Sequence, residues 1–441
     1  MKERGARPSF FSEKINKRDV CMKFNELSAE ERAALLSQYT AEYEAYRARG
    51  LRLDLSRGKP AAEQLDLSNG LFQALSAEDC RATGADYRNY GLGEGIPAMR
   101  HLFSELYGVP EELILACGNS SLQLMHDTLM RCMVFGVGDG HTPWCREERI
   151  KWLCVTPGYD RHFAITERLG FELISVPMTE DGPDMDMVEE LVKDSAVKGM
   201  WCVPKYSNPT GNTYSEETVR RLVSMPCAAP DFRIFWDNAY AIHDLELDGD
   251  VLADVFALAE EVGNEDRIYY FASTSKITFP GAGVAMMAAS KHNLAHLKPL
   301  MNLQTIGYDK INQCRHVAFL KDGATTMAHM HALADSLRPK FACTLRHLSE
   351  LRALGIASYT EPKGGYFVSL DVLPGTARRV FFLMKEAGVT LTQVGATFPY
   401  GVDPKDTNLR LAPTYATLEE LELGMSILVL AVKIAALESM V

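Results

Sequence analysis

The chain has 441 residues, of which 47% are apolar, 24% charged and 9% aromatic, a composition typical of folded globular proteins rather than disordered or fibrous ones. Its formal net charge of −12 argues against a broad basic surface for nucleic acid or anionic lipid, although it is compatible with a small positive pocket. A chain of this length is expected to form two or three domains.

The ten cysteines include no C-x-x-C pair, and several lie in apolar runs such as 152–155. This pattern predicts reduced thiols in a cytoplasmic protein rather than disulfides or a metal site. The first twenty residues are charged and lack the apolar core of a signal peptide. The longest apolar stretch, 425–437, includes Lys433 and is shorter than the ~20 residues that a membrane span needs, so we interpret it as the core-facing part of a helix.

The first predicted element is a helix, because Ser28 and Glu31 have capping-box spacing and Gly50 is a stop signal. We expect an arm before it. Between about residues 113 and 290, short β-rich runs alternate with helical patterns. The runs are apolar on both faces, as buried parallel strands are, and therefore predict an α/β fold with a mainly parallel sheet. They cover 152–155, 171–176, 200–203, 232–236, 268–272 and 284–289.

Downstream, a helical stretch from about 291 to 353 is followed by strand-like segments at 366–370, 390–393 and 409–411. A closing helix begins at Thr417, which has capping-box spacing with Glu420. We therefore expect a large α/β domain and a smaller α+β domain built from both ends of the chain. The predicted bounds are 1–75 for the arm and part of the small domain, 76–325 for the large domain, and 326–441 for the rest of the small domain.

Polar residues follow three successive predicted strands. Ser273-Thr274-Ser275-Lys276 comes directly after 268–272, and a lysine in a dry pocket at a strand end can lose its proton and act as a nucleophile. Asn208-Pro209-Thr210-Gly211 follows 200–203, and Asp237-Asn238-Ala239-Tyr240 follows 232–236. Taken singly, these segments also fit a solvated loop lysine, a turn and a helix start.

In this order and spacing, the three segments resemble the signature of the fold-type I aminotransferases, which use pyridoxal 5'-phosphate (PLP). The resemblance extends over about 53–410 and implies that family's fold, with the large α/β domain binding the cofactor. It also implies that Lys276 links covalently to the cofactor and shuttles a proton. Asp237 would pair with the pyridine nitrogen, and Asn208 and Tyr240 would hydrogen-bond the phenolic oxygen.

The cofactor's phosphate is expected at Gly118-Asn119-Ser120-Ser121, which precedes a helical run whose first backbone N–H groups can hold an anion. Tyr159 ends another strand, where the family places a ring on the cofactor's face, although a core tyrosine is the ordinary interpretation. The resemblance implies phosphate contacts from the 118–121 segment, Ser273, Ser275 and Tyr90 of the partner subunit, so it implies a homodimer with shared active sites.

The chain departs from the family pattern where an arginine usually follows the lysine by seven or eight residues to neutralise the phosphate. Gly283 and Val284 occupy those positions here, so either another basic group compensates or dipoles and hydroxyls hold the phosphate. The chain resembles the divergent subgroup Ic of aspartate aminotransferases in this departure and in the sequences of residues 118–121 and 158–162.

Arg410 lies between apolar residues on a predicted strand, and the family uses this arginine for the substrate's α-carboxylate; pairing with a structural carboxylate is the alternative. Gly58, in a segment similar to the family's substrate loop, and Asn208 are the other expected substrate contacts. A dicarboxylic donor, aspartate first and glutamate as its counterpart, requires a second cation. We select Arg161 and keep three alternatives, which are Arg57, Lys59 and Lys310.

The sequence therefore predicts a PLP-dependent aminotransferase that moves an amino group from a dicarboxylic amino acid to a 2-oxo acid, without nucleic-acid or membrane partners. Another PLP enzyme with the same Lys276 and Asp237, such as an aromatic or kynurenine aminotransferase or a β-lyase, remains an alternative. A PLP-sensing transcription regulator is disfavoured, because the residues before Leu53 show no helix-turn-helix pattern.

Overall fold

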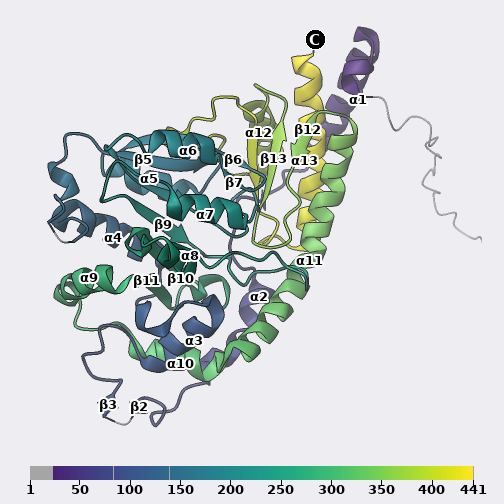
Figure 1. Cartoon of the computed structure of the whole chain (residues 1–441). Helices are drawn as coiled ribbons and strands as arrows, with labels where there is room; N and C mark the ends of the chain where they lie inside the picture. The colour runs from purple at the N-terminus through teal and green to yellow at the C-terminus, as the bar shows by residue number, and fades with distance from the viewer. Residues whose placement is uncertain (1–22, 83, 139, 441) are drawn as a thin grey trace, which may run out of the picture.

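The computed structural model describes residues 23–82, 84–138 and 140–440 (Figure 1). Within these ranges the strands form one eight-stranded sheet and three smaller sheets. The arm predicted before Ser28 falls largely on residues 1–22, which lie outside the described residues. From residue 23 the chain already forms a short 3-10 helix, Phe24–Glu26, whose Phe24 is buried.

The large sheet has the strand order β4-β11-β10-β9-β8-β5-β6-β7 in the described part of the chain. The central strands β10, β9, β8, β5 and β6 pair in parallel, whereas β11, β4 and β7 pair antiparallel with their neighbours. The six runs predicted as strands between 113 and 290 are strands, which confirms the α/β class. Their bounds, with the edge strands, are β4 (Ile114–Ala116), β5 (Lys151–Thr156), β6 (Glu172–Thr179), β7 (Gly182–Pro183), β8 (Val197–Cys202), β9 (Arg233–Asp237), β10 (Ile268–Ser273) and β11 (Ala285–Ala289).

Helices cover both faces of this sheet, which explains why its strands are apolar on both sides. Along β10, Tyr269 and Phe271 belong to one core, and Tyr270 and Ala272 to the other, because successive side chains alternate. One face is covered by α3 (Pro97–Tyr107), α6 (Met185–Leu191), α7 (Glu216–Ser224), α8 (Val255–Glu261) and α10 (Lys310–Leu320). The other is covered by α4 (Ser121–Phe135), α5 (Asp160–Arg168) and α9 (Lys291–Gln304).

A separate core is built from both ends of the chain. Helix α13 packs against α1 and α11, and the three run side by side in Figure 1. A three-stranded sheet of β12, β13 and β15 completes it, and the two-residue strands β1 and β14 pair in parallel. The bounds are α1 (Ala29–Arg47), β1 (Leu53–Asp54), α11 (Gly323–Ala353), β12 (Ala357–Tyr359), β13 (Val368–Val372), α12 (Ala377–Glu386), β14 (Val389–Thr390), β15 (Asn408–Leu411) and α13 (Leu418–Ser439).

Two sequence signals for helix starts are confirmed in this core. Ser28 and Thr417 each form a capping box, with Glu31 and Glu420 respectively. The apolar stretch 425–437 is buried inside α13, as expected of a core-facing helix segment. Among the described residues, none of the helices combines the length and the hydropathy that crossing a bilayer requires.

The parallel strands place their carboxyl ends at one edge of the large sheet. Residues that follow β5, β8, β9 and β10 are therefore brought together there, although they are far apart in sequence. The polar segments singled out in the sequence follow these strands. The arrangement of the sheet thus assembles the candidate site described next.

Candidate functional site

Lys276 ends a short 3-10 helix, Thr274–Lys276, that directly follows β10. Its Nζ lies 4.9 Å from the centroid of the Tyr240 ring. Burial lowers the pKa of Lys276 below its ordinary value, and the nearby negative charge of Asp237 opposes that shift. Lowering the pKa favours the neutral amine, which is the form that acts as a nucleophile or accepts a proton.

Asp237, the last residue of β9, is buried with its two oxygens in different situations. Oδ2 accepts a hydrogen bond from Nε2 of His162 at 3.0 Å, whereas Oδ1 has no partner among the described residues. The His162 ring stacks on Trp201, with centroids 4.3 Å apart and planes at 12°. A buried carboxylate oxygen without a hydrogen-bond donor costs free energy. Oδ1 is therefore suited to accept a hydrogen bond from an N–H or O–H group of a ligand.

His162 and Trp201 were not singled out from the sequence as site residues. His162 lies in the segment 158–162, whose wording supported the family resemblance, but nothing local indicates that its ring reaches β9. Trp201 is part of the apolar strand β8, and the sequence of this strand predicts only that Trp201 is a core residue. Only the packing of α5 against the sheet shows that these two side chains orient Asp237.

The phenols of Tyr159 and Tyr240 stay protonated over the physiological pH range. Burial, helped by the charge of Asp237, raises the pKa of Tyr159 to about 12. Burial also raises the pKa of Tyr240 well above its ordinary value. The rings of Tyr159 and His162 meet edge-on with their centroids 4.9 Å apart, so Tyr159 lies beside the pair of His162 and Asp237.

The residues expected around a phosphate meet at the N-terminus of α4. Ser120 caps this helix by accepting from the backbone N–H of Gln123 at 3.2 Å, and Ser121 is its first residue. The hydroxyl of Ser275 donates to the carbonyl of Asn119 at 3.4 Å, and the Ser273 hydroxyl reaches Ser275 at 3.1 Å. The carbonyl of Gly118 accepts from the backbone N–H of Ala285, which holds the loop against the sheet. A helix N-terminus with convergent hydroxyls is an anion-binding arrangement.

The positions where the family usually carries an arginine serve a packing role here. The backbone N–H of Val284 donates to Thr274 Oγ1 at 2.9 Å. A Cβ at Gly283 would lie 3.1 Å from the same oxygen, so a larger residue there would press on this turn. A side chain at position 283 would therefore require Thr274 and its neighbours to shift by a few tenths of an ångström.

Arg410 reaches the same site from β15. Its Nη1 donates to Asp160 Oδ1 at 2.8 Å and to Asn208 Oδ1 at 3.5 Å, and its guanidinium carbon lies 5.2 Å from the Phe367 ring. The carboxylate pairing considered as an alternative from the sequence is therefore present, and its partner is Asp160. Asn208 is buried and accepts a hydrogen bond from Arg410, so these two predicted substrate contacts lie next to each other.

Gly58 packs against the ring of Phe367, which borders the site. A Cβ added at Gly58 would lie 2.0 Å from Cζ of the Phe367 ring, so only glycine allows the loop to pack this closely. The same ring borders the Arg410 guanidinium. The segment that resembles the family's substrate loop thus lies next to the arginine expected to hold the substrate.

Among the four candidate cations, Arg161 is the one whose charged group has no partner among the described residues. It is exposed on the first turn of α5 and makes no hydrogen bond or ion pair with a described residue, and its charge opposes the raised pKa of Tyr159. The three alternatives have partners of their own. Arg57 pairs with Asp54 at 2.6 Å, Lys59 lies 4.3 Å from the Tyr415 ring, and Lys310 donates to the carbonyl of Gly91 at 2.9 Å.

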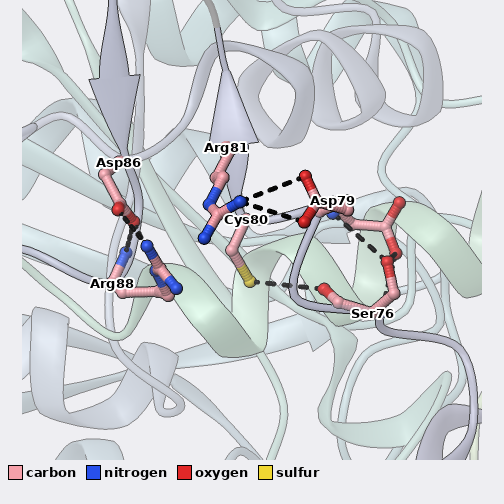
Figure 2. Close-up of polar contacts among 7 residues, drawn as sticks. Ser76, Asp79, Cys80, Arg81, Asp86 and Arg88 are labelled. Atoms are coloured by element: carbon pink, nitrogen blue, oxygen red, sulfur yellow. Dashed lines mark hydrogen bonds and ion pairs between the residues drawn. The ribbon is translucent and has the colours of Figure 1, made fainter.

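Tyr90 is not brought to the site within one chain. Its side chain is 81% exposed, although its segment has contacts with near neighbours in sequence and, through Gly91, with Lys310. Figure 2 shows the contacts between near neighbours around the hairpin of β2 (Arg81–Ala82) and β3 (Ala85–Asp86): Ser76 binds Asp79, and Asp86 accepts from Arg88. These contacts leave the Tyr90 ring exposed.

One cluster outside this site has the residue types of a metal centre. Cys343 and His347, one turn apart on α11, face Glu422 of α13, with their ligand atoms within 4.8 Å of one another. His347 and Arg346 both bind Glu422, so the carboxylate already has two partners. These contacts account for the cluster as part of the packing of α11 on α13.

The chain is similar to known proteins along most of its length. A family model described as aspartate aminotransferase matches residues 27–441. An aspartate aminotransferase of Corynebacterium glutamicum is 48% identical over 399 residues, which is 90% of this chain and 92% of the relative. The crystal structure of an aspartate transaminase from the same organism superposes with a TM-score of 0.93 at 46% identity, covering 96% of this chain and 100% of that one. An alpha-aminoadipate aminotransferase of Thermus thermophilus, complexed with N-(5'-phosphopyridoxyl)-L-leucine, superposes with a TM-score of 0.71 at 25% identity, covering 88% and 94%.

Proposed function

Because this chain belongs to the aspartate aminotransferase family, we propose that it binds PLP through Lys276 and moves the amino group of a dicarboxylic amino acid to a 2-oxo acid. Aspartate is the first candidate donor and glutamate its counterpart. The observation that carries the proposal is the meeting of a half-buried lysine of lowered pKa, a buried carboxylate with one oxygen free, and a guanidinium at one edge of the sheet.

The residues present fit PLP. Bound PLP draws electrons away from the α-carbon of an amino acid and so makes its hydrogen acidic. Asp237 Oδ1, which lacks a donor, would accept from the pyridine N–H and keep that nitrogen protonated. His162 donates to Oδ2 and fixes the plane of the carboxylate. The N-terminus of α4, with Ser273 and Ser275, would hold the phosphate.

Lys276 would act as the base. Its pKa is lowered by burial, so Nζ is neutral in a larger fraction of molecules and can take a proton from the substrate's α-carbon. The centroid of the Tyr240 ring lies 4.9 Å from Nζ, so the amine of the lysine packs against this aromatic ring. Tyr240 and Asn208 would donate hydrogen bonds to the phenolic oxygen of the cofactor.

Two cations would orient the substrate. Arg410 would bind the α-carboxylate that all amino donors share, with Asn208 beside it. Arg161, exposed and without a bound carboxylate in the described chain, would bind the distal carboxylate of aspartate or glutamate. This division makes Arg410 necessary for every donor and Arg161 necessary only for acidic ones.

The proposal includes a homodimer in which Tyr90 of the partner subunit completes the phosphate site. Its support is that the Tyr90 side chain is 81% exposed in the single chain and is therefore available to a second subunit. A shared site also places the substrate at the boundary between two copies of the chain.

A screen of half-reactions tests the proposed function. Each amino acid is added to PLP-loaded enzyme without a 2-oxo acid, and the absorbance of the bound cofactor is followed. We expect the fastest change with aspartate and glutamate. Borohydride reduction followed by peptide mapping should label Lys276, and Lys276→Ala should bind PLP but lose turnover by several orders of magnitude. A label on another lysine contradicts the assignment, and faster turnover of aromatic donors contradicts the specificity.

A further inference from the structure

The pairing of Arg410 with Asp160 joins two elements that are far apart in the chain. Asp160 is the first residue of α5, and Arg410 lies on β15. Nη1 and Oδ1 are 2.8 Å apart, and the side chains of Arg410 and Asp160 are 10% and 33% exposed. A charge-assisted hydrogen bond of this length is well formed. The arginine assigned to the substrate thus already has a carboxylate partner within the chain.

The other contacts of Arg410 are longer. Nη1 also donates to Asn208 at 3.5 Å, and Nε donates to Thr392 Oγ1 at 3.4 Å. Nη2 makes no hydrogen bond to any described residue. Within the described part of the chain, Asp160 is therefore the only carboxylate on this guanidinium, and the Nη2 side is open to a second one.

We propose that Asp160 is a positioning residue that holds Arg410 through Nη1, leaves Nη2 for the substrate's α-carboxylate, and weakens the binding of that carboxylate through its own charge. This inference rests on the proposed function, in which Arg410 binds the α-carboxylate. Two carboxylates on one guanidinium repel each other. The repulsion acts on amino donors and 2-oxo acid products alike, because both carry this group. Asp160 therefore limits the affinity for both and favours product release.

Titration of the PLP-loaded enzyme with succinate measures this effect without turnover, because succinate has carboxylates but no amino or oxo group. Asp160→Asn keeps an oxygen that accepts from Nη1 but removes the charge. We expect the Kd of succinate, measured by calorimetry, to fall about 5-fold. Asp184→Asn is the matched control, since Asp184 also lies at a helix start but pairs with no arginine in the described chain. Its Kd should equal that of the wild type.

Asp160→Glu tests whether charge is the cause, because it keeps the carboxylate. We expect its Kd for succinate to stay within about 2-fold of the wild type. In steady-state kinetics, Asp160→Asn should lower the KM of alanine and aspartate by the same factor, with kcat unchanged or lower. An unchanged or raised Kd in Asp160→Asn, or an equal tightening in Asp160→Glu, overturns the role of Asp160.

Arg410→Gln separates this inference from the proposed function. If this variant loses succinate binding while Asp160→Asn binds as the wild type does, only the role of Asp160 is wrong. If Arg410→Gln binds succinate as tightly as the wild type, Arg410 does not hold the carboxylate, and both the assignment and the inference fail.

Discussion

At the scale of single residues, the site depends on charges that burial and neighbours adjust. Lys276 is shifted toward its neutral form by burial, and Asp237 shifts it in the opposite direction. Asp237 is in turn oriented by His162, whose ring rests on Trp201. The properties of each group therefore depend on residues contributed by other elements, which here are the helix α5 and the strands β8 and β9.

The pH dependence of the reactivity of the Lys276 amine follows from these two opposing effects on its pKa. A lowered pKa means that the neutral amine dominates at a lower pH than in a free lysine, whose pKa is 10.5. In the cofactor-free protein, the pH profile of the rate at which trinitrobenzenesulfonate modifies Lys276 should therefore have its midpoint below that pH. Asp237→Asn removes the charge that raises the pKa, so its profile should move to still lower pH. Peptide mapping resolves the sites, and Lys291, 77% exposed, is an internal control. A shift to higher pH in Asp237→Asn would contradict this account.

Arg161 should decide between acidic and neutral donors. A hydrogen bond between charged groups contributes about 1.5–3 kcal/mol, so Arg161→Ala should lower kcat/KM for aspartate roughly 10- to 150-fold and spare alanine. Arg168→Ala is a matched control, because Arg168 is exposed at the other end of the same helix. Equal losses for both donors would mean that Arg161 is structural or binds the shared carboxylate.

At the scale of elements, the site residues are positioned by close contacts between loops, strands and helix ends. Phe367 lies between the loop at Gly58 and the guanidinium of Arg410. The strand β15 brings Arg410 up to α5, and the N-terminus of α4 meets the turn after β10. Small residues at these contacts allow the backbones to approach closely.

Gly58→Ala should destabilise the protein, because the new Cβ would lie 2.0 Å from the Phe367 ring. Overpacking of this kind costs about 1–3 kcal/mol, and urea unfolding measures the loss. Gly281→Ala is the matched control, since a Cβ there meets no atom within 4 Å. We expect its free energy of unfolding to change by less than about 0.5 kcal/mol. Equal stabilities of the two variants would show that Phe367 moves aside freely.

At the scale of the whole molecule, the site lies where the large sheet and the core built from both chain ends pack together. The large sheet contributes Lys276 and Asp237, and the core built from both chain ends contributes Arg410. The position of the substrate is thus defined by how the two parts pack together. In the proposed dimer, a third contribution comes from Tyr90 of the partner subunit.

Mixing of inactive variants tests the shared site. Lys276→Ala and Tyr90→Ala homodimers should each have low activity. In a heterodimer, one site combines Lys276 from one chain with Tyr90 from the other and is intact. Joint refolding of equal amounts should therefore restore activity toward about a quarter of the wild type, the value for random pairing of two chains. A fully active monomer, or no gain on mixing, would contradict the shared site.

The sequence by itself determined the strand pattern, the helix starts and the chemical types at the site. Runs apolar on both faces predict buried parallel strands, and the capping boxes at Ser28 and Thr417 predict helix starts, because both signals are local. The order of the polar segments after three strands indicated the chemistry around Lys276. Only the tertiary structure decided that His162 holds Asp237 and that Asp160 holds Arg410, contacts between residues 75 and 250 positions apart. A local pattern states which groups are available, whereas the packing of the sheet and helices decides which of them meet and how strongly burial shifts their charges.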